Sequence, residues 1–201
     1  MDFPLNTLGL AHRFLAAHIR PGAFCVDATA GKGRDTVFLA KLAGPQGRVL
    51  AMDIQPQAVE ATKALIQTEG VADRVEVVLD SHSNLSRYAS PGTADAVVFN
   101  FGWLPGGSHQ IFTRAQTSIP AITQGLELLK PDGVMSLCIY YGRDCGYEER
   151  DALLEFLETI DDRRFTVLVS RFANRPNDPP IPVFIWGPQA KAGGKEGLPL
   201  L

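Results

Sequence analysis

The sequence is poor in the features that mark several common classes of protein. Its three cysteines, Cys25, Cys138 and Cys145, form no CxxC pair, which argues against a thioredoxin-like motif or a zinc finger and favours reduced thiols. It has no signal-peptide pattern and no run of about 18 uncharged apolar residues, so we expect a cytoplasmic protein without membrane contact. The motifs of zinc proteases, α/β-hydrolases and P-loop nucleotidases are absent as well.

The chain also lacks a strong charge of either sign. Its 19 basic and 22 acidic residues give a formal charge of −3, so an RNA substrate would need a local basic patch. A length of 201 residues with 45% hydrophobic content suits one domain, which we expect over residues 1–187. Residues 188–201, rich in glycine and lysine, are expected to be a disordered tail.

Short apolar runs alternate with helical patterns along this domain. The alternation predicts an α/β fold with a parallel sheet and right-handed crossovers. The last two strands are joined without a helix and should pair antiparallel, which gives a Rossmann-like sheet of seven mostly parallel strands ending in a hairpin. Strands are predicted at 23–27, 48–54, 74–80, 94–100, 134–141, 165–172 and 181–187, helices at 5–19, 35–42, 56–68, 119–129 and 148–160, and a turn at 130–133.

The most informative segment is VDATAGKGRDT, which runs from an apolar strand through a glycine turn into a helix. Gly31 and Gly33 permit a sharp turn, and the N-terminus of the next helix supplies unpaired N–H groups, as in nucleotide-type cofactor sites. The third glycine of the dinucleotide fingerprint is replaced by Thr36. This departure argues against a pyrophosphate and favours a cofactor without phosphates.

Acids end the next two strands, where they would meet the glycine turn at one edge of the sheet. Asp53 is placed to accept hydrogen bonds from both ribose hydroxyls, Ile54 to pack on adenine and Asp80 to lie near the adenine edge. S-adenosylmethionine fits these features, with Asp27 and the glycine turn facing its methionyl end. The predicted cofactor-binding residues are Asp27, Thr29, Ala30, Gly31, Gly33, Asp35, Thr36, Asp53, Ile54, Gln55, Asp80, Ser81, His82 and Asn100.

The fourth strand runs into FNFGWLPGG, which presents an amide and carbonyl oxygens beside the expected sulfonium. Asn100 and the carbonyl of Phe101 suit an amine nucleophile, and we predict that they orient its lone pair. The amine must be neutral, which costs about 4.6 kcal/mol at pH 7 for a lysine-like pKa. His82 and Asp35 are both candidate bases; His82 alternatively caps a short helix, and it has no partners at metal-ligand spacing, so we expect no metal.

Six segments carry a resemblance to a known family: DATAGKGRDT (27–36), DIQPQAVEAT (53–62), DSHSNL (80–85), FNFGWLPGG (99–107), YYGRDCGYEE (140–149) and NRPNDPP (174–180). Taken together, they resemble the MnmM (YtqB)-like class I methyltransferases, once labelled rRNA methylases. The resemblance covers nearly the whole chain except the tail. It implies methylation, from S-adenosylmethionine, of the exocyclic amine of 5-aminomethyl-2-thiouridine at the tRNA wobble position.

RNA contacts are expected from loops that flank the crevice. Arg143 stands where the family leads us to expect a histidine, which leaves the choice of substrate open. Arg171 and Arg175 lie in a second loop, in which the asparagines and prolines shape either the rim of the crevice or a homodimer contact. The predicted substrate-binding residues are Gly102, Trp103, Leu104, Pro105, Tyr141, Arg143, Asn174 and Asn177, with Trp103 and Tyr141 stacking on a splayed base.

Three other functions stay open on the sequence. A methyltransferase of this kind acting on rRNA or on a small-molecule amine would use the same cofactor site. A nicotinamide-dependent oxidoreductase is favoured by the glycine turn and Asp53, and disfavoured by Thr36 and the terminal hairpin. A noncatalytic RNA-binding module is disfavoured by the acidic net charge.

Overall fold

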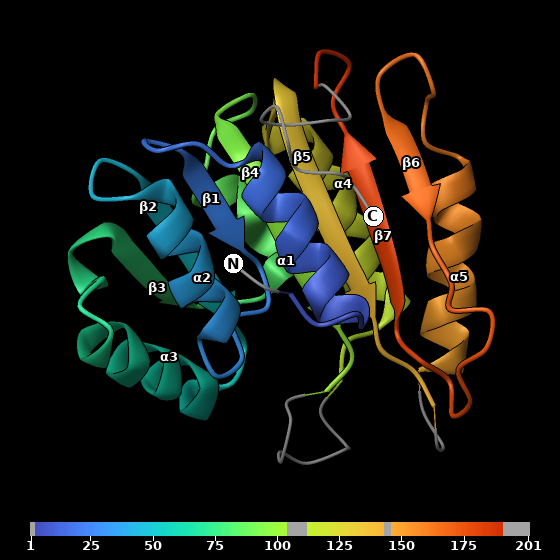
Figure 1. Ribbon diagram of the computed structural model, residues 1–201, viewed down its shortest axis with the longest axis horizontal. Helices are drawn as coiled ribbons and strands as arrows, with labels where there is room; N and C mark the ends of the chain where they lie inside the picture. The colour runs from blue at the N-terminus through green and yellow to red at the C-terminus, as the bar shows by residue number, and fades with distance from the viewer. Residues whose placement is uncertain (1–2, 104–111, 143–145, 191–201) are drawn as a thin grey trace.

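The structure is a computed structural model that describes residues 3–103, 112–142 and 146–190. One sheet of seven strands runs through it in the order β3-β2-β1-β4-β5-β7-β6 (Figure 1). β7 is antiparallel to both of its neighbours, β5 and β6. The other four strand pairs are parallel. The strands are β1 (Phe24–Asp27), β2 (Arg48–Asp53), β3 (Val75–Leu79), β4 (Ala94–Phe101), β5 (Leu129–Ile139), β6 (Thr166–Val169) and β7 (Ile181–Trp186).

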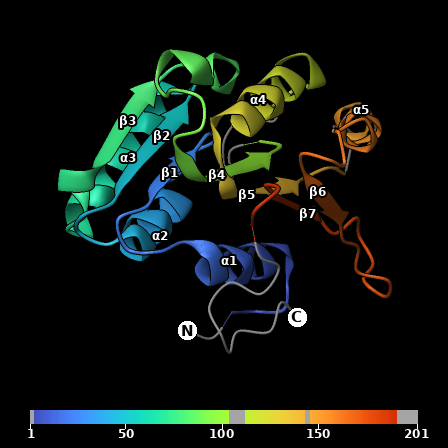
Figure 2. The ribbon, with the colours of Figure 1, turned by 90° about the horizontal axis from the view of Figure 1, so that it is seen from above.

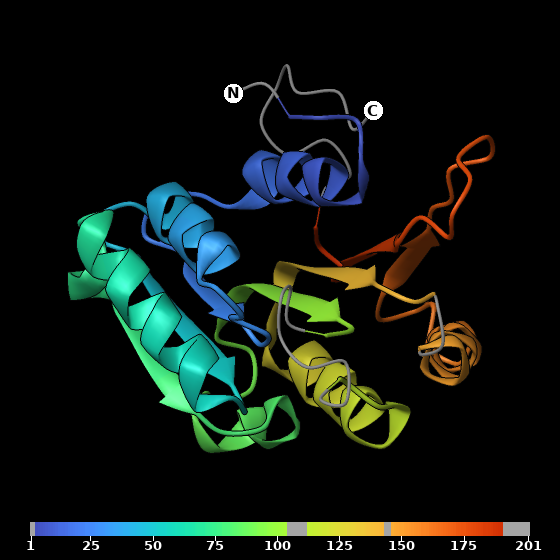
Figure 3. The same cartoon turned by 90° about the horizontal axis from the view of Figure 1, so that it is seen from below.

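Helices cover both faces of this sheet, as Figures 2 and 3 show from opposite directions. The helices α1 (Thr7–His18), α2 (Arg34–Ala43) and α3 (Pro56–Thr68) lie on one face. The other face carries α4 (Ala115–Leu128), α5 (Tyr147–Glu158) and the short 3-10 helix η2 (His82–Arg87). A second 3-10 turn, η1 (Ala72–Arg74), precedes β3. None of the helices in the described part of the chain has the length and apolar character needed to cross a bilayer.

The central strands are apolar on both sides because helices cover both faces. In β4, Val97 and Phe99 belong to the core under α4 and α5, whereas Ala96 and Val98 belong to the core under α1 and α2. All four side chains are at most 3% exposed. The continuous apolar runs in the sequence are therefore the pattern of buried parallel strands, and the predicted seven-stranded sheet is confirmed.

The boundaries around β5 differ from the prediction. The helix predicted from residue 119 begins at Ala115, and the strand predicted from Val134 begins at Leu129. Leu129 is paired with Ala94, and the register resumes only at Val134 opposite Ala96. The predicted turn at 130–133 is thus an irregularity inside the strand, because Leu129 is buried and held in the sheet before the chain bends outward.

The remaining strands and helices begin and end within a few residues of their predicted bounds. Among these strands, β6 falls furthest short of its predicted length. It was expected over 165–172 and spans Thr166–Val169. The hairpin prediction is confirmed, and β7 lies between β5 and β6. Ile181 at the start of β7 pairs with Ile139 at the end of β5, so residues 170–180 lie at the edge of the sheet where the parallel strands end.

This edge is also joined to the beginning of α1. The hydroxyl of Thr7 donates to the carbonyl of Pro180 at 2.6 Å, and the guanidinium of Arg175 donates to the carbonyl of Leu5. The cation of Arg175 lies 4.2 Å from the ring centroid of Phe172. The start of α1 and the segment before β7 therefore form one side of the region in which the strands end.

Candidate active site

The turn between β1 and α2 is built on two glycines in the left-handed region. Gly31 has φ = +54° and Gly33 has φ = +78°, and the chain enters α2 directly from Gly33. A Cβ at Gly33 would lie 2.9 Å from the Cα of Thr62 in α3, closer than such atoms approach. Glycine is therefore required here both by the backbone conformation and by the close packing of the turn on α3.

Asp53 connects this turn to the end of β2. Its Oδ2 accepts from the N–H of Gly31 and its Oδ1 accepts from the N–H of Gln55, both at 2.9 Å. Burial raises the pKa of the Asp53 carboxyl, and these backbone bonds oppose that effect. Each carboxylate oxygen keeps further acceptor capacity, so the side chain can also take hydrogen bonds from a ligand.

Asp27 lies behind the turn rather than in front of it. It is fully buried, accepts from the Thr36 hydroxyl at 2.5 Å and from the N–H of Thr29 at 3.3 Å. Burial, and next the charge of Asp35, raise the pKa of Asp27 to about 7. Asp27, Gly33 and Thr36 line neither of the two pockets that open where the strands end, so they support the turn from beneath.

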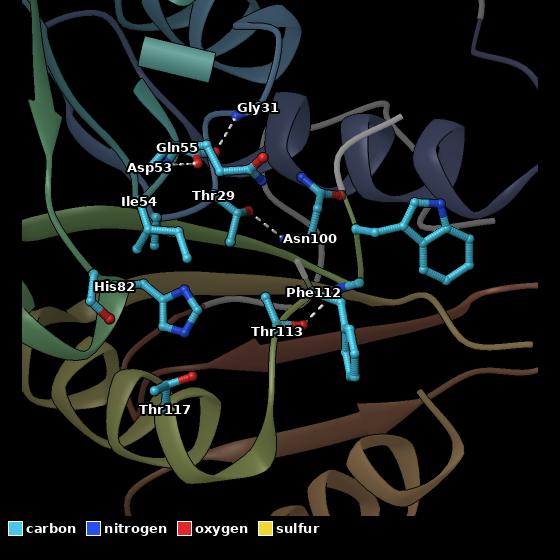
Figure 4. Close-up of a pocket in the computed structure, with 14 residues that line it drawn as sticks. Thr29, Gly31, Asp53, Ile54, Gln55, His82, Asn100, Phe112, Thr113 and Thr117 are labelled. Carbon is cyan, nitrogen blue, oxygen red and sulfur yellow. Dashed lines mark hydrogen bonds between the residues drawn. The ribbon is translucent and has the colours of Figure 1, made fainter. Parts of the chain in front are cut away.

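Two adjoining pockets open where the strands end. The first has a volume of about 160 Å³ and lies against Asp53, Ile54 and His82, whereas the second has a volume of about 310 Å³ and lies against Leu8, Asp35 and Tyr140. Figure 4 shows side chains from several strands and from the start of α4 converging on the first pocket. The residues that line both pockets are Thr29, Gly31, Asn100 and Trp103.

Asn100 lies at the junction of the two pockets with its amide held in one orientation. Its backbone N–H donates to the Thr29 hydroxyl at 2.7 Å, and its Nδ2 donates to Oδ2 of Asp35 at 2.8 Å. The other oxygen of Asp35 lies 2.7 Å from Nε2 of His12. Because the nitrogen of the amide faces Asp35, its Oδ1 is turned away from that carboxylate and is the acceptor of the side chain.

Phe101 contributes differently from the prediction. Its carbonyl, expected to face the substrate, accepts from the N–H of Tyr140 at 2.8 Å, and its ring is fully buried. The carbonyl therefore completes the pairing of β4 with β5 in this structure.

His82 lines the first pocket with a nitrogen that has no hydrogen-bond partner among the described residues. The residue is 8% exposed, and its Nε2 makes no hydrogen bond within the described part of the chain. Burial lowers the pKa of His82 to about 4, so the ring is neutral at pH 7. Ser81 caps η2, as its hydroxyl accepts from the N–H of Ser83 at 3.2 Å, so the alternative in which His82 is the cap was wrong.

Asp80 is occupied beside this helix. Its carboxylate accepts from the amide of Asn84, the hydroxyl of Tyr88 and the N–H of Ser81, which lower its pKa. It does not line either pocket, whereas its neighbour Ser81 lines the first.

The segment after β4 is held at its base by a network that sequence reasoning missed. The N–H of Gly102 donates to the Thr113 hydroxyl at 2.7 Å, and that hydroxyl donates to Glu149 of α5 at 2.7 Å. Ser118 of α4 donates to the other oxygen of Glu149 at 2.6 Å. Glu149 is 4% exposed, and burial raises the pKa of its carboxyl. This carboxylate therefore joins the loop after β4 to two helices.

The chain is similar to a family of known proteins over most of its length. The model of a family described as "Putative rRNA methylase" matches residues 49–186. The chain belongs to this family. A chloroplastic tRNA (mnm(5)s(2)U34)-methyltransferase of Arabidopsis thaliana is 32% identical over 179 residues, which cover 85% of this chain. The chain spans 65% of the length of that curated relative.

Two solved structures share this fold over almost their whole length. A crystal structure of a family protein from Clostridium thermocellum matches with a TM-score of 0.89 and 40% identity, covering 92% of this chain and 100% of that one. A methyltransferase of Streptococcus mutans in complex with SAH matches with a TM-score of 0.83 and 34% identity, covering 92% and 99%. Sequence and fold therefore place the chain among the S-adenosylmethionine-dependent methyltransferases, as the resemblance predicted.

The first pocket fits the adenosyl part of that cofactor on its own chemistry. Asp53 offers acceptors for ribose hydroxyls, and Ile54 beside it is an apolar side chain that is 53% exposed. Nε2 of His82, which lacks a partner in the part of the chain that the structure describes, is a buried polar atom to which a ligand can hydrogen-bond. Asp53, Ile54, Gln55 and Ser81 all line this pocket, and Thr29, Ala30, Gly31 and Asp35 line the second, whereas no cluster of metal-ligating residues occurs in the described ranges.

The predicted substrate residues of this family member are brought together only in part. Gly102 and Trp103 line the first pocket, but Tyr141 lies outside both pockets, where its ring packs edge-on against Tyr147. Tyr140, one residue earlier, is the tyrosine that lines the second pocket. Asn174 and Asn177 lie in the segment before β7, also outside the pockets. Leu104, Pro105 and Arg143 lie outside the described residues, as do residues 191–201 of the predicted tail.

Proposed function

We propose that this protein is an S-adenosylmethionine-dependent N-methyltransferase that acts on 5-aminomethyl-2-thiouridine at the wobble position of tRNA. The product is the 5-methylaminomethyl form of the nucleoside. The name of the Arabidopsis relative supports this assignment, and so does the resemblance of the whole domain. The cofactor, when bound, supplies an electrophilic methyl group carried on a sulfonium.

The fixed amide of Asn100 is the observation that supports an amine as the group that receives the methyl. Its nitrogen is held by Asp35, so its Oδ1 is the atom that can accept from an amine N–H at the junction of the pockets. An N–H held in this way leaves the lone pair of a neutral amine free to point elsewhere. Thr29 fixes the backbone of Asn100 at the same point, so the acceptor is positioned before substrate arrives.

The side chains around the junction also suit a substrate that arrives as a cation. The carboxylate of Asp35 lines the second pocket and attracts an ammonium group. Lys32 and Arg34 line the same pocket and are available to phosphate groups of a polynucleotide. Trp103 lines both pockets and offers an aromatic face to an unstacked base.

The test is methyl transfer from labelled cofactor to tRNA that carries or lacks the aminomethyl group, followed by nucleoside mass spectrometry. We expect transfer only to the aminomethylated tRNA. Transfer to ribosomal RNA, which the family description favours as the second candidate, without transfer to this tRNA would overturn the assignment.

A substitution tests the role of Asn100 in the same assay. We expect Asn100→Ala to lower turnover by about a hundredfold and to lower affinity for S-adenosylhomocysteine far less, because the lost Oδ1 is the atom that positions the amine. Asn84→Ala is the matched control, since Asn84 also donates its amide to a carboxylate, that of Asp80 at 2.8 Å, outside both pockets. Wild-type turnover of Asn100→Ala would show that another group positions the amine.

A further inference from the structure

His12 continues the hydrogen-bonded chain of the active site toward solvent. Its Nε2 lies 2.7 Å from Oδ1 of Asp35, whose Oδ2 receives the amide of Asn100. Its ring stacks on Phe38 with centroids 4.0 Å apart and planes inclined by 18°, and Phe3 packs edge-on against both rings. The side chains of His12 and Asp35 are 20% and 12% exposed. Three elements, α1, α2 and β4, thus contribute one continuous path from the pocket to the surface.

The chemistry of the pocket requires such a path. The negative charge of Asp35 favours the ammonium form of an amine substrate, but an ammonium nitrogen has no lone pair with which to attack. A proton must therefore leave the substrate inside the pocket before methyl transfer. A carboxylate that only attracted the ammonium would oppose this step.

Four other polar groups described near the junction are poorly suited to take that proton. The amide of Asn100 is not basic, and the carbonyl of Phe101 is paired with the N–H of Tyr140. Burial holds the pKa of His82 at about 4, so it does not keep a proton at pH 7. Asp27 is fully buried behind the turn and does not line either pocket.

We propose that Asp35 and His12 form the proton exit of the methyl transfer, with His12 as the group that holds the proton and releases it to water. This inference rests on the proposed amine acceptor. An N–H bond of the substrate ammonium breaks, and its electron pair stays on nitrogen as the attacking lone pair. The proton passes through the carboxylate of Asp35, and the pair changes from neutral imidazole with carboxylate to imidazolium with carboxylate. Solvent then removes the proton from the imidazolium.

The charges that face this pair come from several elements. Asp35 and Arg34 lie on α2, Lys32 lies just before it and Tyr140 follows β5. The charge of Asp35 reaches Tyr140 on the wall of the second pocket, since it contributes to the raised pKa of that hydroxyl. A change in the protonation of the pair is therefore felt at Tyr140.

The test replaces His12 with glutamine, which can still donate a hydrogen bond to Asp35 but cannot hold a proton. We expect His12→Gln to lower kcat on aminomethylated tRNA by about tenfold or more at pH 7, with the deficit shrinking as pH rises and free solvent takes the proton. Affinity for S-adenosylhomocysteine should stay at the wild-type value, and the loss of ring packing on Phe38 should lower the unfolding temperature equally at every pH. His18→Gln is the matched control on the same helix, because His18 lies outside both pockets.

A wild-type pH profile of kcat for His12→Gln would overturn the proposal. Nitrogen NMR of histidine-labelled wild-type protein gives a second measurement that does not depend on the variant. The ring signals of His12, assigned by their loss in His12→Gln, should report a change in protonation when aminomethylated tRNA joins the complex with S-adenosylhomocysteine; an unchanged ring would also overturn the proposal.

Failure of the proposed substrate gives a different result. If the wild-type protein methylates another amine and not this tRNA, the substrate assignment fails. The comparison of wild type with His12→Gln is then made on that amine, and the proton exit stands or falls on the same pH profile. If no amine is methylated, both proposals fail.

Discussion

The N–H of Gly31 donates to Oδ2 of Asp53 at 2.9 Å, so the turn after β1 is tied to the acid that ends β2. The two residues are 22 positions apart, and both line the first pocket. Because the same carboxylate also receives the N–H of Gln55, its orientation is fixed by the backbone on two sides. The acceptor for a ribose is thereby held in place by the fold before any ligand binds.

Replacing this acid should weaken cofactor binding. We expect Asp53→Ala to lower the affinity for S-adenosylhomocysteine by about tenfold to a hundredfold, since hydrogen bonds to a charged group contribute about 1.5–3 kcal/mol. Calorimetric titration measures the effect. Asp162→Ala is the control, because Asp162 is an exposed acid that lines neither pocket. Equal affinity of Asp53→Ala and wild type would contradict the predicted role.

The close packing of the glycine turn on α3 can be separated from its backbone conformation. Gly22 has φ = +87° and open space around a Cβ, whereas Gly33 has φ = +78° and a Cβ position 2.9 Å from Thr62. We expect Gly22→Ala to cost about 1–2 kcal/mol of unfolding free energy, and Gly33→Ala to cost more because a clash is added. Urea unfolding of the two variants measures the difference, and equal losses would mean that α3 yields to the new methyl group.

Thr113 is expected to stabilise the loop after β4 through its hydroxyl alone. Thr113→Val leaves the N–H of Gly102 and an oxygen of Glu149 without their partner, which should cost about 1–3 kcal/mol of unfolding free energy. Thr113→Ser keeps the hydroxyl and should stay near the wild-type stability. We also expect the KM for RNA to rise in the valine variant with little change in affinity for S-adenosylhomocysteine. Identical unfolding curves for the valine and serine variants would contradict this role.

His82 should make the free energy of unfolding depend on pH below pH 6.5. Burial lowers its pKa from 6.5 to about 4 in the folded protein, so the unfolded chain takes up a proton first as pH falls. Stability contributed by the neutral ring is therefore complete above pH 6.5 and is lost as pH falls toward 4. In urea unfolding at several pH values, wild type should lose more stability over this window than His82→Leu; parallel curves would show that the ring is not protected from protonation.

The fold and the main wall of the site could be predicted from local patterns. Strand runs, helical periodicity and the missing helix before the last strand determine the sheet, and the ends of parallel strands necessarily meet at one edge. Gly31, Asp53 and Asn100 all stand at such ends, which is why simple position along the chain brought them together. The predicted start of β5 was wrong because a Pro-Asp-Gly sequence, which is typical of a turn, can also interrupt the pairing within a strand.

The contacts that join elements distant in the chain could not be predicted in this way. The pairing of His12 with Asp35 depends on how α1 packs against α2, and nothing in the local pattern of α1 distinguishes His12 from His18. The buried Glu149 reads as an ordinary charged residue in the first turn of α5. The sequence predicted Tyr141 as a substrate contact, but Tyr140 is the tyrosine that lines the second pocket. Both residues follow the end of β5 at Ile139, where the alternation of a strand no longer tells which side chain faces the pocket.

The place of β7 between β5 and β6 has a consequence for synthesis of the chain. β5 is made about forty residues before β7, the strand that pairs with its second edge. Its Val134–Ile139 segment is apolar apart from Ser136. During translation this segment has an open hydrogen-bonding edge, and β6 has no neighbour at all until β7 emerges. The sheet is therefore complete only after β7 has left the ribosome. A nascent chain that stalls before residue 181 exposes the unpaired edge of β5, which can pair with other chains and aggregate.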